Sequence, residues 1–163
     1  MFDYGKLIDD EERRGDSAVA NEARKARDIE LVAFFREVEI ELGIEMAKAN
    51  IELKRHSAPI ISGPFRPIRD QEKIEFAFGL KNPCCRITLQ NTDARLQVSA
   101  IRVELVDESG AVKASTRFVI EGDHRPLKAF RSLVEGFPDR TAELTVSQIG
   151  QEIVSGIIRG RFV

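Results

Sequence analysis

The stretch KRHSAP, residues 54–59, separates two regions of the chain with different hydrophobic patterns. Before it, apolar residues recur every three or four positions on an acidic background, which is typical of an amphipathic α-helix. After it, apolar and polar residues alternate in short runs between turn residues, which is typical of antiparallel strands. The sequence therefore predicts an α+β fold. A long N-terminal helix leads into an antiparallel β-meander of four to five strands, and a C-terminal helix packs on the sheet.

The chain of 163 residues is long enough for one ordinary domain with an extension. Residues 1–15 contain a run of mixed charge and few large apolar side chains, so we expect a disordered leader there. Residues 16–54 are the predicted helical extension, with Asp16 or Ser17 as its N-cap. Residues 55–163 are the predicted α+β domain.

Two apolar stripes run along the predicted helix. The first consists of Leu31, Phe35, Val38, Leu42, Met46, Ala49 and Leu53. The second lies on roughly the opposite side and consists of Ile29, Ala33, Ile40, Ile44 and Ile51. A helix that is apolar on two sides must be covered on both sides. We therefore expect the first stripe to pack on the sheet and the second to form the interface of a homo-oligomer, with a dimer as its most favoured state.

Residues 37–46 leave an alternative open, because their apolar residues also alternate with glutamate and glycine as they would in a strand. Glutamate favours helices over strands, and both flanks are rich in Ala, Lys and Glu, so the helix is the preferred interpretation. An extended segment here would remove the two-sided helix and, with it, the reason to expect self-association.

Turn residues divide the rest of the chain. Residues 58–67 contain three prolines and a glycine, and we expect an extended or turn-containing linker there. Alternating runs follow as far as a short strand at residues 127–131. The last element is predicted to be helical, with Thr145 or Ser147 as its cap and an apolar face that includes Ile149, Ile153 and Ile157.

The net charge of −2 conceals an asymmetry along the chain. Residues 1–53 carry 14 acidic and 8 basic side chains, whereas residues 54–163 carry 13 acidic and 17 basic ones. Among the basic residues, Arg86, Arg102 and Arg117 stand in predicted strands and could form an anion-attracting patch for RNA or another polyanion. The pI of about 5.8 and the lack of aromatic residues between these arginines argue against a nucleic-acid partner.

No pattern of catalytic, cofactor-binding or metal-binding residues is found, so we expect no cofactor and no metal site, and a non-enzymatic protein is the preferred interpretation. The two cysteines, Cys84 and Cys85, are adjacent, so a disulfide bond between them could not link distant parts of a domain. We therefore expect two reduced thiols in a reducing compartment. The N-terminus lacks a targeting pattern, and the longest apolar run has five residues, residues 31–35. These observations predict a cytoplasmic protein without membrane contact.

The function that these patterns favour is that of a non-enzymatic interaction or assembly protein, which could also bind another protein. The alternative is a small-molecule binding protein, possible enzymatic activity included, with an apolar cavity between the sheet and the C-terminal helix. Its predicted lining consists of Phe76, Phe78, Phe118, Ile153 and Ile157. The third hypothesis is polyanion binding by the basic face of the sheet.

Overall fold

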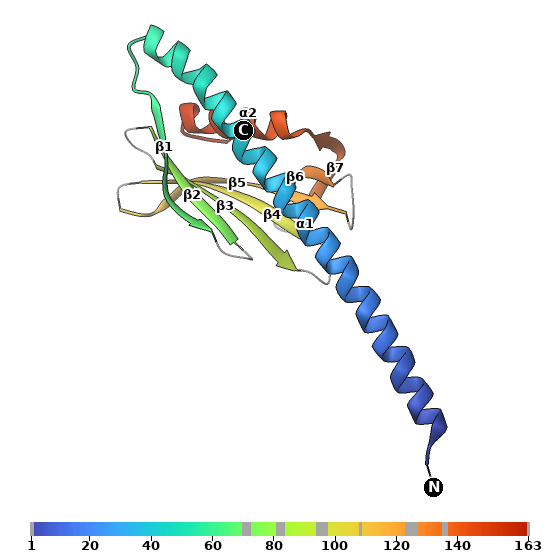
Figure 1. Ribbon diagram of the computed structural model, residues 1–163. Coiled ribbons are helices and arrows are strands. Elements are labelled where there is room, and N and C mark those ends of the chain that lie inside the picture. The colour runs from blue at the N-terminus through green and yellow to red at the C-terminus, as the bar shows by residue number, and fades with distance from the viewer. Residues whose placement is uncertain are drawn as a thin grey trace.

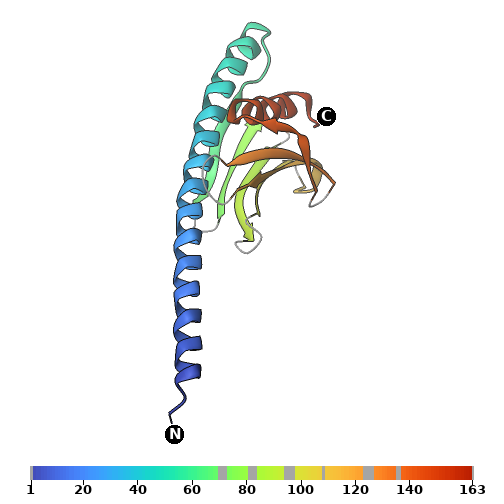
Figure 2. The same ribbon diagram turned by 90° about the vertical axis from the view of Figure 1, so that its right-hand side faces the viewer.

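Figures 1 and 2 show a computed structural model of the chain. The structure describes residues 2–69, 73–80, 84–93, 98–107, 109–122, 127–134 and 137–162. Its elements are α1 (Tyr4–Arg55), β1 (Ile61–Arg69), β2 (Lys73–Leu80), β3 (Cys84–Asp93), β4 (Val98–Val106), β5 (Val112–Glu121), β6 (Lys128–Val134), β7 (Phe137–Leu144) and α2 (Val146–Arg159). Both helices lie on the same side of the antiparallel sheet, and the N-terminal half of α1 projects beyond it (Figure 2). The predicted α+β fold is confirmed.

The described strands form one sheet in chain order, β1 to β7, with each strand antiparallel to the next. The sheet is larger than the four to five strands that the sequence predicts, because strands are added at both edges. Strand β1 includes most of residues 58–67, where a linker is expected. Pro64 and Pro67 in β1 and Pro138 in β7 suit edge strands, which need donors on one side only. The register shifts in both edge pairs are consistent with these prolines.

Helix α1 begins earlier than the sequence predicts. The Asp3 side chain accepts a hydrogen bond from the backbone N–H of Lys6 at 3.1 Å, so Asp3 is the N-cap in place of Asp16 or Ser17. Residues 4–15, where a disordered leader is expected, are helical in the structure. The mixed charge of this run suits a helix, because oppositely charged residues three positions apart lie side by side, as in the pair of Asp10 and Arg13.

The two interpretations of residues 37–46 are resolved in favour of the helix, because α1 continues through them without a break. Its inner side fills the hydrophobic core between the helices and the sheet. Helix α1 contributes Leu31, Phe35, Val38, Leu42 and Met46 to this core. The central strands contribute Ile87, Ile101, Val103, Leu105, Phe118 and Ile120, and α2 contributes Ile149, Ile153, Val154 and Ile157. The first predicted stripe therefore packs against the sheet.

Helix α2 starts at the predicted cap, Thr145, whose hydroxyl oxygen accepts from the backbone N–H of Gln148 while the Gln148 side chain accepts from the Thr145 N–H. It ends at Gly160, which has a φ of 70°. Gly150 lies against α1, where an added Cβ would come within 3.3 Å of Glu41 Cγ. This close approach holds α2 beside α1.

A buried arginine fastens α1 to the sheet. Arg27 is only 2% exposed, its Nε donates to the carbonyl oxygen of Gly122 at 2.9 Å, and its Nη2 donates to Ser99 Oγ at 3.2 Å. Ser99 lies in β4 and is fully buried, and Gly122 directly follows β5. Buried polar groups need such partners, so the three groups fix the position at which α1 leaves the sheet.

Candidate functional site

The outer side of α1 carries a second row of apolar side chains, which we call the outer stripe. It consists of Ile29, Val32, Ile40, Ile44 and Ile51, which are 44% to 69% exposed. The inner side of the same helix segment is buried in the core. Successive residues of the outer stripe are separated by three, four, seven or eight positions, so the stripe follows the helix over about six turns.

Four of the five residues predicted for an interface, Ile29, Ile40, Ile44 and Ile51, lie in the outer stripe. The fifth, Ala33, is half-buried at its margin. Val32 was missed by the sequence analysis, although its position three residues after Ile29 is the signal that places it on the same side. The stripe is therefore continuous at its N-terminal end.

Small residues occupy the middle of the outer stripe. Gly43 and Ala47 are both exposed and lie one helical turn apart. An added Cβ at Gly43 would meet no atom within 4 Å, so nothing in the fold itself requires a glycine there. Glycine in the middle of a helix costs about 1 kcal/mol relative to alanine. Arg36 is the charged residue that interrupts the stripe.

The register of the sheet brings the three predicted patch arginines onto the face that is turned away from the helices. Arg86 lies opposite Glu104, and Arg102 lies opposite Arg117. Arg86 Nη2 is 3.0 Å from Glu104 Oε1, so an ion pair neutralises it. Within the described residues, Arg117 Nε is a buried atom without a hydrogen-bond partner. The patch thus has one exposed arginine, Arg102, beside one that is partly covered.

Three of the five residues predicted to line an apolar cavity lie in the hydrophobic core instead. Phe118, Ile153 and Ile157 belong to the packed core, and the side chains of Phe76 and Phe78 are outside the described part of the structure. A pocket of about 470 Å³ does lie between the sheet and α2, but polar side chains dominate its walls. They include Arg131, Gln148, Gln151, Glu152, Ser155, Arg159 and Arg161. Arg131 and Glu152 form an ion pair within it.

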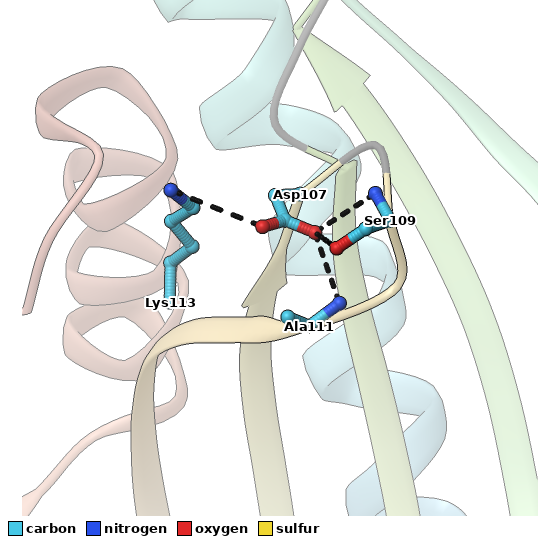
Figure 3. Close-up of polar contacts among 4 residues, drawn as sticks. All are labelled: Asp107, Ser109, Ala111 and Lys113. Carbon is cyan, nitrogen blue, oxygen red and sulfur yellow. Dashed lines mark hydrogen bonds and ion pairs between the residues drawn. The ribbon is translucent and has the colours of Figure 1, made fainter.

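The hairpin between β4 and β5 is organised by Asp107 (Figure 3). Its Oδ1 accepts hydrogen bonds from the Ser109 hydroxyl at 2.6 Å, from the Ser109 N–H at 2.9 Å and from the Ala111 N–H at 2.9 Å. Lys113 Nζ lies 3.8 Å from the other carboxylate oxygen. The Ser109 hydroxyl, followed by the Ala111 N–H, lowers the pKa of Asp107.

Acidification is expected to weaken this hairpin. A carboxyl group whose pKa is lowered by folding stabilises the folded state above its unfolded pKa, and that contribution is lost as the pH falls through the folded pKa. An NMR titration of the Asp107 carboxyl carbon should therefore give a midpoint below the ordinary value of about 3.9. Asp107→Ala should lower the thermal midpoint at neutral pH but have little effect below the folded pKa. A carboxyl midpoint at or above 3.9 would contradict this assignment.

Across the described residues, no group of three His, Cys, Asp or Glu side chains is arranged to hold a metal ion. In the same part of the chain, no helix has both the length and the apolar character that crossing a membrane requires. Comparison of the chain with family models, curated proteins and solved structures finds no match.

Proposed function

We propose that this protein is a non-enzymatic interaction or assembly protein that forms a homodimer through the outer stripe of α1. The observation that carries the proposal is the two-sided helix, because one side of α1 fills the core while the opposite side leaves five large aliphatic side chains exposed. Full burial of one such side chain contributes about 1.5–3 kcal/mol. A row of exposed apolar side chains on an otherwise charged surface, here interrupted by Arg36, is typical of a protein–protein contact.

The position of the stripe makes it accessible to a second copy. It lies on the side of α1 opposite the core, and the helix runs along the outside of the molecule (Figures 1 and 2). Two copies that meet through their stripes would place the two α1 helices together, with one sheet on each outer side. This contact is isologous, since the same surface is used by both subunits, and it closes at two copies. A reducing compartment, where Cys84 and Cys85 stay as thiols, is the setting that we propose, namely the cytoplasm.

The test is the double substitution Ile40→Glu/Ile44→Glu in the full chain. It should raise the dimer dissociation constant at least a hundredfold, because unpaired carboxylates would have to be buried in the contact. Sedimentation equilibrium over a range of concentrations measures this constant. The matched control is Val112→Glu, which places a carboxylate on another exposed apolar residue, 48% exposed and located in β5. A wild-type chain that sediments as a monomer at every concentration, or a control as disruptive as the double variant, would refute the proposal.

A further inference from the structure

Four charged residues follow one edge of the outer stripe at intervals of whole helical turns. They are Glu30, Glu37, Lys48 and Arg55, at steps of 7, 11 and 7 residues. Glu30 and Glu37 both line the groove between α1 and the start of α2, which places them on the same side of the helix. Lys48 and Arg55 are 66% and 70% exposed. The four residues are thus acidic in the first half of the edge and basic in the second, and within one subunit Lys48 and Arg55 each form an exposed ion pair with the glutamate three residues earlier, Glu45 and Glu52.

This charge pattern is arranged symmetrically about the middle of the stripe. Glu37 lies six residues before Gly43 and Lys48 lies five residues after it. Glu30 and Arg55 lie thirteen residues before and twelve residues after the same glycine. A two-fold axis that passes between residues 42 and 43, perpendicular to the helix, would exchange each acidic position with a basic one.

From this symmetry we propose that the two α1 helices of the dimer run antiparallel and cross at Gly43, an inference that rests on the proposed self-association. In this arrangement Glu37 faces Lys48 of the partner subunit, and Glu30 faces Arg55 of the partner subunit. Each pair occurs twice, so four complementary pairs flank the contact. Such complementary charges fix the orientation of two partners more than they add to affinity.

The apolar residues fit the same arrangement. The two-fold rotation brings Ile40 to within one residue of the level of Ile44 of the partner subunit, and Val32 to within two residues of the level of Ile51 of the partner subunit. Gly43 lies at the crossing point, where the missing side chain lets two helix backbones approach closely, and the small Ala47 lies one turn away. This provides a reason for a glycine that the fold of a single subunit does not require.

A parallel dimer would bring unlike edges of the two stripes together. The other edge of the stripe carries Asp28 and Glu39, which are separated by 11 residues, or about three turns. Glu30 and Glu37 would then face this edge and not Lys48 and Arg55 of the partner subunit, so the four complementary pairs would be lost. The charge distribution thus favours the antiparallel orientation over the parallel one.

The antiparallel orientation also determines where the projecting N-terminal halves of α1 lie, because they then leave the dimer at opposite ends. With a rise of about 1.5 Å per residue, the two copies of residue 12 would be about 90 Å apart. In a parallel dimer the same residues would be separated by little more than the interaxial distance of about 10 Å. This difference permits a direct measurement.

The experiment uses the full chain with Cys84→Ser and Cys85→Ser, and with Glu12→Cys labelled by a donor or an acceptor dye. Mixed labelled dimers should show almost no energy transfer, while sedimentation of the same sample verifies that it is dimeric. Dimers with efficient transfer would overturn the antiparallel arrangement and leave the proposed function intact. A labelled sample and a wild-type chain that are both monomeric would instead refute the proposed function itself.

Charge exchange provides a second readout that does not need labels. Glu37→Lys and Lys48→Glu should each raise the dissociation constant about tenfold, and the double variant should restore it to nearly the wild-type value. In a parallel dimer Glu37 and Lys48 would not face each other, so the double variant would not restore the constant. The control is Asp10→Arg/Arg13→Asp, which exchanges an exposed pair on the projecting part of α1 and should leave the constant unchanged.

Discussion

Replacing Arg27 by alanine is expected to lower the free energy of unfolding by about 3 kcal/mol. The substitution leaves the buried hydroxyl of Ser99 and the carbonyl oxygen of Gly122 without the donor that the structure provides. Hydrogen bonds from a charged donor contribute about 1.5–3 kcal/mol each, and the lost side chain adds a cavity. Chemical denaturation at a fixed protein concentration measures the change, since dimer formation makes stability depend on concentration.

The control for this prediction is Arg14→Ala, which removes an arginine of the same helix from an exposed ion pair with Glu11. Exposed pairs of this kind contribute less than about 1 kcal/mol, so this variant should unfold at nearly the wild-type denaturant concentration. If Arg27→Ala were as stable as Arg14→Ala, the hydrogen bonds of Arg27 would not be what holds α1 on the sheet.

The second large effect is expected for Leu42→Ala, which should cost about 2–5 kcal/mol of folding stability. Leu42 is fully buried on the inner side of α1, so its truncation leaves a cavity between the helix and the sheet. Alanine is the best helix former, so the helix itself is not weakened by the change. The measurement is again the free energy of unfolding at fixed protein concentration.

Ile44→Ala, two residues away and 44% exposed, is the matched comparison on the opposite side. It should change the stability of the single subunit by less than about 1 kcal/mol, whereas it should weaken self-association. The two variants thus separate the folding side of α1 from its proposed contact side. Equal losses of subunit stability in both variants would show that the two sides of the helix do not have distinct roles.

Much of the fold follows from local sequence patterns. The long helix, the antiparallel meander and the C-terminal helix with its Thr145 cap are each indicated by periodicity and by residues that end or begin elements. The edge strands were missed for a physical reason. Proline-containing strands such as β1 have weak local propensity and form because β2 offers unpaired backbone groups along its edge.

The start of α1 was also placed too late, at Asp16 or Ser17, because a mixed charge run is compatible with disorder as well as with a helix. What selects the helix is the side-chain cap from Asp3 and the pairing of opposite charges one turn apart. A run of charged residues therefore needs to be read by the spacing of its signs and not only by its composition.

The candidate site was partly accessible from the sequence. Four residues of the outer stripe follow from helical spacing. The burial of Arg27 could not be predicted from the sequence, because an arginine within a charged helix gives no local sign that it is buried. Likewise, the partner of Arg86 depends on the register between β3 and β4, which brings Glu104 opposite it.

The order of residues along the chain was enough to specify the long helix, the central meander and the C-terminal helix, and which side chains share one side of a helix. Those properties depend on the 3.6-residue and two-residue repeats of the backbone, which are local. The tertiary structure decided how many strands join the sheet, which arginine would be buried and which residues would pair across strands. These outcomes depend on contacts between residues far apart in the chain, such as Arg27 with Gly122, 95 positions away, which no local repeat encodes.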